Sequence, residues 1–211
     1  MKKFLAFFVP YLLFVLIFLG MIIGNSKADL HLWMTSVHTP FLDIFFHYYT
    51  LVGDWIPFAV AGLLILYNYR ITIFIVASQL ICGIFSKSLK CLFDEQRPIL
   101  FFQQHFPSIQ LHRVAGEHLY TAQSFPSGHT ITAFAFFLVL AFYTRKPGLH
   151  FLYFVLALLV GFSRIYLSQH FAVDVLAGSA VGILAVITCK YLFEKLPYKW
   201  LNNLYADTFK R

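Results

Sequence analysis

Apolar residues along this chain gather in long runs that contain few charged positions. A helix that crosses a membrane needs about 20 predominantly apolar residues, and the first run, residues 4–24, meets that length. The pattern predicts six such spans, at residues 4–24, 51–67, 71–92, 128–143, 149–167 and 171–193. We therefore expect an all-α fold: a polytopic membrane protein whose six transmembrane helices form one bundle and a single domain over residues 1–211.

The segments between the runs differ in character. Residues 25–50 mix aromatic side chains with His and Asp, which is typical of an amphipathic segment lying in the membrane interface after the first span. Residues 93–125 form a long polar and aromatic connection. Lys2 and Lys3 precede the first run as in a signal peptide, but that run exceeds the usual apolar core of about 7–15 residues. We expect an uncleaved first span.

Composition supports the membrane assignment. The chain is 60% hydrophobic and 12% charged, with a mean hydropathy of +0.74. Soluble domains are about 45–50% apolar and about 25% charged, so a water-soluble globule is excluded. The net charge of +7 comes from dispersed basic residues that form no stripe, which argues against a nucleic-acid partner.

Orientation follows from Lys and Arg in the short connections. One side of the membrane would hold Lys2, Lys3, Arg70, Arg145, Lys146, Lys195, Lys199, Lys210 and Arg211. The other side holds Lys27 and Arg113 together with charges at the ends of spans. The sequence predicts a cell-membrane (inner-membrane) protein with both termini cytoplasmic and the second side facing the periplasm or cell exterior.

Charged side chains collect at the outer ends of four predicted spans. Ionisable residues near a bilayer are costly unless paired or hydrated, so they are functional candidates. Snorkelling at the interface explains Lys87 or Arg113 alone, but not His170 and Asp174. The span order places the following residues at one face: Lys90, Arg97, His129, Arg164, His170 and Asp174.

The spacing of these residues suggests pairs. His170 and Asp174 are four apart, so on a helix they share a face, where Asp fixes the tautomer of His and stabilises its positive form. Taken alone, such a pair is more often structural. Lys90 and Arg97 are seven apart, two helical turns, although Pro98 biases Arg97 out of the helix.

The stretch "SFPSGHT", residues 124–130, opens the fourth span. Ser127 beside Pro126 is typical of a helix start. Gly128 carries no side chain where free backbone N–H groups point outward, and a helix N-terminus favours phosphate. His129 would stand beside that anion as a proton donor. A well-capped helix with an incidental His is the alternative.

Three segments occur in order: "KCLFDEQRP" at 90–98, "PSGH" at 126–129 and "SRIYLSQHFAVD" at 163–174. Together they resemble the motifs of the phosphatidic acid phosphatase type 2 superfamily, whose membrane branch comprises lipid phosphate phosphatases. The resemblance implies a hydrolase of cell-envelope lipid metabolism. It implies that His170 attacks phosphorus to form a phosphohistidine, that Asp174 orients His170, and that His129 protonates the leaving group and then activates water. It also implies phosphate binding by Lys90, Arg97, Arg164, Ser127 and Gly128.

Metal binding is the natural rival, given nine histidines. Six lie in the two outer segments at irregular spacing, and we interpret them as incidental: His31, His38, His47, His105, His112 and His118. The prediction is a metal-independent enzyme without a cofactor, and Cys82, Cys91 and Cys189 are read as packing residues.

Three other classes of protein fit the sequence less well. A transporter would carry His, Asp and Arg near the midplane of the membrane, whereas here they gather at one face. The vanadium haloperoxidase branch shares the motifs but is soluble. A scaffold without catalysis fits poorly with the full residue set. The expected partner is a phosphorylated membrane lipid, with undecaprenyl diphosphate, phosphatidylglycerol phosphate, phosphatidic acid and lipid A phosphate left open, as is the oligomeric state.

Overall fold

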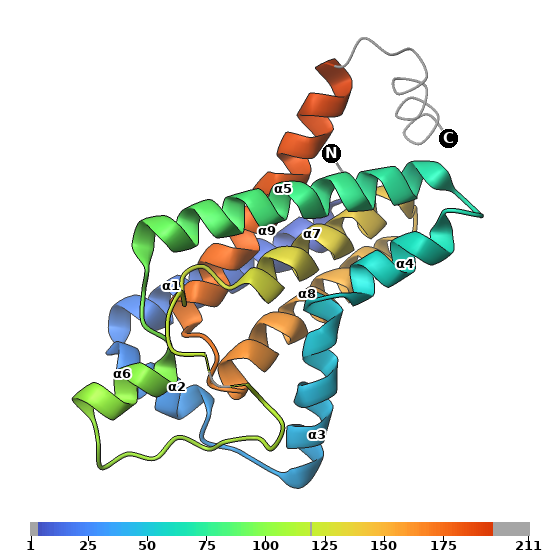
Figure 1. Ribbon diagram of the computed structural model, residues 1–211. Coiled ribbons are helices and arrows are strands. Elements are labelled where there is room, and N and C mark those ends of the chain that lie inside the picture. Colours follow the sequence, from blue (N-terminus) through green and yellow to red (C-terminus); the bar gives the residue numbers. More distant parts are fainter. Residues whose placement is uncertain (1–3, 119, 196–211) are drawn as a thin grey trace.

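The computed structural model describes residues 4–118 and 120–195, and within these ranges the regular structure is entirely helical (Figure 1). This confirms the predicted all-α class. The elements in chain order are α1 Leu5–Gly24, α2 Lys27–Met34, α3 Pro40–Tyr49, the 3₁₀ helix η2 Thr50–Gly53, α4 Ile56–Leu64, α5 Tyr69–Phe93, α6 Pro98–His105, α7 Gly128–Tyr143, α8 Pro147–Tyr166 and α9 Ala172–Lys195.

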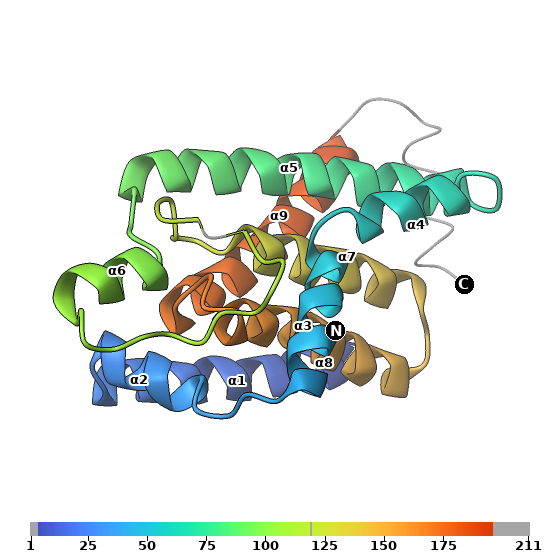
Figure 2. The same ribbon diagram turned by 60° about the horizontal axis from the view of Figure 1, so that its bottom comes forward.

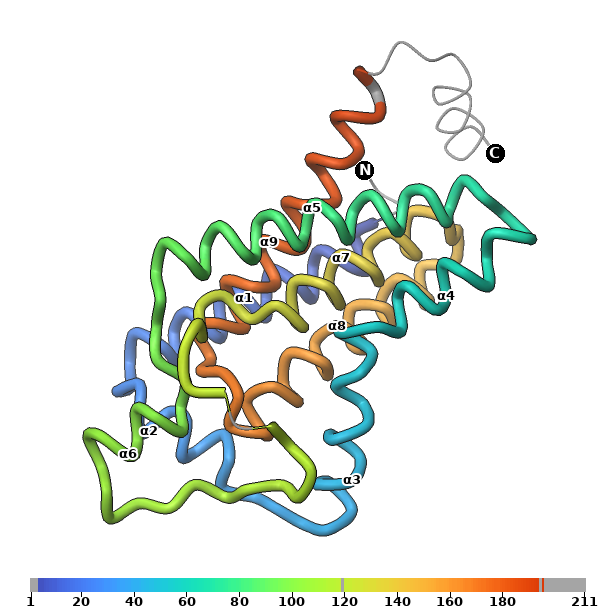
Figure 3. Tube along the Cα trace, viewed as in Figure 1, coloured from blue at the N-terminus to red at the C-terminus, as the bar shows by residue number. Residues whose placement is uncertain are grey.

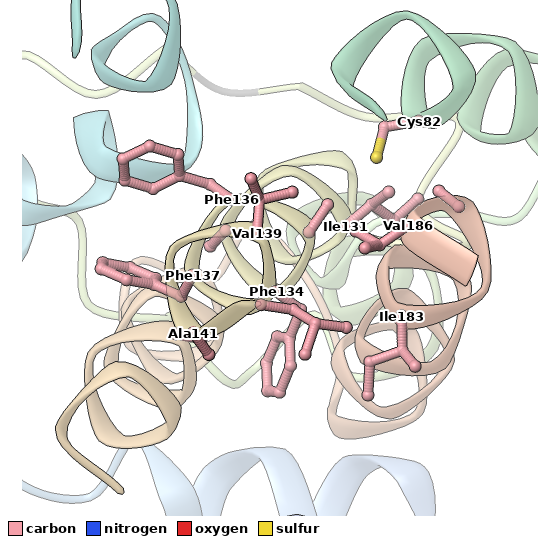
Figure 4. Packing of buried hydrophobic residues seen from close by; sticks show 14 of the residues in the cluster. Cys82, Ile131, Phe134, Phe136, Phe137, Val139, Ala141, Ile183 and Val186 are labelled. Atoms are coloured by element: carbon pink, nitrogen blue, oxygen red, sulfur yellow. The ribbon is translucent and has the colours of Figure 1, made fainter. Parts of the chain in front are cut away.

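Helix α7 lies at the centre of the bundle and packs against α5, α8 and α9 (Figures 1 and 3). Its sequence is apolar on all sides, as expected of a helix surrounded by others. Ile131, Phe134 and Leu138 are completely buried. Figure 4 shows Ile131 and Phe134 of α7 in the same packed cluster as Ile183 and Val186 of α9. The core therefore holds the first turn of α7 at a fixed depth in the bundle.

Two glycines allow other segments to approach that first turn closely. A Cβ atom at Gly178 of α9 would lie 2.8 Å from the carbonyl oxygen of Ser127. A Cβ atom at Gly53 of η2 would lie 2.6 Å from the carbonyl oxygen of His129. Real Cβ contacts are essentially never shorter than 3.0 Å. The absence of a side chain at both positions therefore helps to set where α7 begins.

Within the described residues, four helices are long and apolar enough to cross a membrane, α1, α5, α8 and α9, and α7 is a shorter apolar helix. Five predicted spans coincide with these helices. The span predicted at residues 51–67 is not one continuous helix, because η2 ends at Gly53 and α4 has only nine residues. Nine helical residues extend about 13.5 Å against a hydrocarbon thickness of about 30 Å. The count of six spans therefore stays a prediction.

The segment predicted to lie in the interface, residues 25–50, contains α2, which contacts α1, and α3, which crosses beside α8 (Figure 2). Its outward face carries the exposed aromatic side chains Trp33, Phe41 and Tyr48. The connection after α5 holds a further helix, α6, which the sequence pattern did not predict. Five residues used to predict the orientation lie outside the described ranges: Lys2, Lys3, Lys199, Lys210 and Arg211.

Candidate active site

The residues proposed from the motifs lie at one end of the bundle, where α5 and α8 end and α7 and α9 begin (Figure 1). Four of the ionisable side chains among them are almost completely removed from solvent. The exposed fraction is 1% for His170, 2% for Asp174, 4% for Arg164 and 7% for Arg97. Buried charged groups are rare unless partners surround them, so their local contacts decide what the site can do.

His170 and Asp174 form the centre of the site. His170 Nδ1 lies 3.4 Å from Asp174 Oδ2. The expected reason, a shared helix face, was wrong, because His170 precedes α9 and lies in a bend. Asp174 is instead the third residue of α9, and its Oδ2 accepts the backbone N–H of Phe171 at 2.8 Å. A carboxylate that reaches back over a helix start in this way is one half of a capping box.

Ser124 completes this pair, and the sequence reasoning did not single it out. Its hydroxyl donates to Asp174 Oδ2 at 2.5 Å and lies 3.4 Å from His170 Nδ1. The backbone N–H of Ser127 donates to the carbonyl oxygen of Asp174 at 3.0 Å. The start of α7 is thus joined to the start of α9 by both a side-chain and a backbone bond. The only signal for Ser124 was its position in "SFPSGHT".

Arg97 reaches the site from outside α5. That helix ends at Phe93, and Arg97 is the extended residue before α6 with ψ 160°, outside the helix as the following Pro98 predicted. Its Nε donates to the carbonyl oxygen of Ala122 at 2.9 Å, and its Nη1 donates to Gln169 Oε1 at 3.1 Å. Gln169, which the sequence reasoning also missed, therefore links Arg97 to the residue beside it, His170.

Gln169 is itself anchored. Its Nε2 donates to the carbonyl oxygen of His118 at 2.9 Å. The ring of Tyr120 lies 4.8 Å from the guanidinium carbon of Arg97, within the range of a cation–π contact. The connection between α6 and α7 therefore holds the side chain of Arg97 in place.

Arg164 lies in the last turn of α8. Its Nη1 donates to Thr50 Oγ1 at 2.7 Å, which ties α8 to η2. Its Nε is buried and has no hydrogen-bond partner within the described part of the chain. A buried guanidinium without a full set of acceptors is costly, so this position favours an added anion.

Lys90 is half-buried, and Arg97, Arg164 and Asp174 all lie close enough to act on its charge. Lys90 also lines a pocket of about 280 Å³ with Gly83, Ser86, Lys87, Cys91 and Gln123. Three cations thus share this end of the bundle with the carboxylate of Asp174. Glu117 and Asp54 also act on the charge of Arg164. Three cations gathered at one end of the bundle make it a site for a compact, multiply charged anion.

The start of α7 contributes its capping residue and His129. Ser127 Oγ accepts a hydrogen bond from Thr130 Oγ1 at 2.8 Å and from the Thr130 N–H at 3.5 Å. A Cβ atom at Gly128 would lie 3.5 Å from Ser86 Oγ, an ordinary contact. The fold therefore does not itself require a glycine there. His129 is partly buried, and Arg164, His170, Arg97 and Lys90 act on its charge.

The protonation state of His170 follows from this setting. Burial, and then the positive charges of Arg97, Arg164 and Lys90, hold the pKa of His170 well below its ordinary value. We expected Asp174 to stabilise the positive form of His170. Instead, burial and the three cations outweigh it, and the imidazole is neutral at neutral pH. A neutral imidazole is the nucleophilic form.

Comparison with known proteins gives a family and several relatives. A family model described as the PAP2 superfamily matches residues 58–198. "Phosphatidylglycerophosphatase B" of Bacillus subtilis is 37% identical over 82 residues, which are 35% of this chain and 40% of the relative. "Lipid A 4'-phosphatase" of Porphyromonas gingivalis is 27% identical over 182 residues, 83% of this chain and 76% of the relative.

Among solved structures, the crystal structure of Aquifex aeolicus LpxE resembles this fold with a TM-score of 0.65. The sequence identity is 27%, and the match covers 78% of this chain and 94% of that one. The matched family region contains every residue proposed for the site. The first relative named above is matched over only two-fifths of its length.

Proposed function

Because this chain belongs to the PAP2 superfamily, a family that includes membrane lipid phosphatases, we propose that it hydrolyses a lipid phosphate monoester or diphosphate through a phosphohistidine. The observation that carries the proposal is the buried neutral His170 beside three cations, one of which, Arg164, has a buried Nε without a hydrogen-bond partner among the described residues. Such a site provides a nucleophile and a binding place for the phosphoryl group together.

In the first step His170 attacks phosphorus. Asp174 and Ser124 occupy its Nδ1 side, which leaves Nε2 as the attacking atom. The new N–P bond forms as the bond from phosphorus to the leaving oxygen breaks, and His129 gives that oxygen a proton. The Nδ1 proton stays shared with Asp174, which balances the positive charge that develops on the ring.

In the second step water attacks the phosphohistidine. His129, now neutral, accepts a proton from the water as the P–O bond forms and the N–P bond breaks. Inorganic phosphate leaves and His170 returns to its neutral form. General acid and base roles of this kind suit an imidazole.

Lys90, Arg97 and Arg164 compensate the charge on the equatorial phosphoryl oxygens, and the backbone N–H of Gly128 adds a donor. The Oγ of Ser127 already accepts from Thr130, so its own hydroxyl hydrogen is the part that is free to reach the phosphate. These groups supply the charge without a metal ion, which supports metal-independent hydrolysis.

The proposed topology has six spans in one domain over residues 1–211, both termini cytoplasmic and the active site at the outer face. The second span would be formed by the broken segment containing η2 and α4. The pocket beside Lys90 on α5 offers the headgroup a lateral way in from the bilayer. The transporter alternative fits less well, since the charged residues lie at one end of the bundle and not at its middle.

The substrate class follows from the relatives. Those named above act on phosphatidylglycerol phosphate and on lipid A, and a further relative is named as an undecaprenyl-diphosphatase. Purified protein is incubated in detergent with each of these lipids and with phosphatidic acid, and phosphate release is measured in EDTA. We expect release from at least one lipid, and none with His170→Ala. Activity lost in EDTA and restored by Mg²⁺ would refute the cation-based mechanism, and transport without hydrolysis would favour the transporter.

A further inference from the structure

A second group of titratable side chains lies outside the proposed catalytic site. His38 in the connection from α2 to α3, Asp43 in the first turn of α3 and His112 in the connection from α6 to α7 come together. One potential ligand atom from each lies within 4.8 Å of the others. The irregular spacing of these histidines predicted no metal site. We propose that the three residues bind one divalent transition-metal ion of the zinc type.

The distances suit this interpretation. His112 Nε2 lies 3.0 Å from Asp43 Oδ2, and His38 Nδ1 lies 3.7 Å from Asp43 Oδ1. Nitrogen and oxygen ligands lie about 2.0–2.2 Å from zinc, which places neighbouring ligand atoms roughly 3–3.5 Å apart. The two imidazole rings are stacked with centroids 3.9 Å apart. Small side-chain movements would therefore place both nitrogens and a carboxylate oxygen around one ion.

The His38 nitrogen that faces Asp43 is Nδ1. His38 Nδ1 is buried and has no hydrogen-bond partner among the residues that the structure describes. This nitrogen is therefore available as a metal ligand.

Asp43 is also held in place from behind. The hydroxyl of Tyr166 donates to Asp43 Oδ1 at 2.6 Å, which leaves Oδ2 as the ligand atom. A hydrogen bond to the non-ligating part of a ligand is the usual outer-shell support of a metal site. The side chain of His112 is 39% exposed, so water can reach the ion and fill its open positions.

Such an ion would join three segments at the end of the bundle that carries the proposed active site. The connection that contributes His112 continues to the carbonyl groups of His118 and Ala122, which hold Gln169 and Arg97. Figures 1 and 2 show this connection running from α6 towards α3 before it returns to α7. The ion would therefore clamp the connection in place and take no part in the chemistry.

The test measures metal content directly. Protein without a polyhistidine tag is stripped with EDTA in detergent, given Zn²⁺, passed through gel filtration and analysed by elemental mass spectrometry and calorimetric titration. We expect one equivalent per chain for the wild type and for the control His105→Ala. His105 is exposed and lies outside the group. His38→Ala and His112→Ala should each weaken zinc binding by at least about tenfold, and Tyr166→Phe by about 10–100-fold.

Melting temperatures separate loss of the site from loss of the fold. Without metal, His112→Ala should melt near the wild type, because the residue is largely exposed. Zinc should raise the melting temperature of the wild type and of His105→Ala but not that of His112→Ala. Equal zinc binding by the wild type and by the double variant lacking His38 and His112 would overturn the proposal. Neither measurement depends on phosphatase activity.

Discussion

Gly53 offers a sharp test of how the fold positions the proposed acid. In the Gly53→Ala variant the new Cβ atom would lie 2.6 Å from the carbonyl oxygen of His129 and 2.6 Å from Cγ1 of Val160. The backbone of η2 is not left-handed at this position, so alanine itself causes no backbone strain. The neighbours must move apart by about 0.4 Å or more, and overpacking of this kind costs about 1–3 kcal/mol. The His129 side chain is displaced with its backbone.

We expect this displacement to lower kcat as well as stability. A misplacement of about 1 Å in a reacting group costs about 100-fold in rate, so a shift of a few tenths of an ångström should cost about tenfold in kcat. Lipid substrates, whose leaving oxygen needs a proton from His129, should be affected more than an activated aryl phosphate.

The assay compares kcat for a lipid and an aryl phosphate in Gly53→Ala and in the matched control Gly62→Ala. Gly62 lies in the neighbouring α4, and a Cβ atom there would meet nothing within 4 Å. The control should keep wild-type kcat for both substrates. If the ratio of kcat for the lipid to kcat for the aryl phosphate is the same in the two variants, the contact between η2 and α7 does not position His129, and the reasoning fails.

Three further outcomes follow from the site. Ser124→Ala removes a hydrogen bond to the carboxylate of Asp174. Because such bonds contribute about 1.5–3 kcal/mol, kcat should fall about 10–100-fold. The control variant Ser108→Ala, at an exposed position, should keep the wild-type kcat. Gln169→Ala removes the support of Arg97 and should raise KM for lipid phosphate several-fold, which Gln110→Ala, exposed, should not do. Because the pKa of His170 is lowered, kcat/KM should persist as pH falls below about 6.5, the ordinary value, and fall only as pH passes through the lowered pKa. Arg97→Ala should move that acid limb upward, and an unchanged limb would contradict the electrostatic argument.

Much of this arrangement was predictable from sequence, and the remainder has identifiable physical causes. Apolar run length predicts α1, α5, α7, α8 and α9, because helix length and hydrocarbon thickness are matched. The same measure did not reveal the interruption within residues 51–67, where Asp54 and Trp55 separate η2 from α4. Run length reports hydrophobicity and does not report where backbone hydrogen bonds stop.

The site, like the fold, was predictable from the sequence only in part. The order of the spans places Lys90, His129 and Asp174 at one end, and the structure brings them there. Residue spacing gave the wrong reason for the approach of His170 to Asp174, since His170 is not on α9. Pro98 correctly predicted that Arg97 leaves the helix. Ser124, Gln169 and Thr50 escaped notice because their roles depend on partners 50, 72 and 114 positions away in sequence. Contacts of that range arise from packing, which no local pattern contains.

The free energy that is needed to hold the positive charges of the site close together must be offset elsewhere in the molecule. Arg97, Arg164 and Lys90 repel one another in a poorly hydrated space, and Asp174, Glu117 and Asp54 compensate part of their charge. The offset comes from the apolar packing of α7 against α5, α8 and α9, together with hydrogen bonds such as those of Arg164 to Thr50 and Arg97 to Gln169. A bound phosphoryl group would relieve the same repulsion. Phosphate or vanadate should therefore raise the melting temperature, and Arg164→Ala should reduce this increase; an equal increase in that variant would place the anion elsewhere.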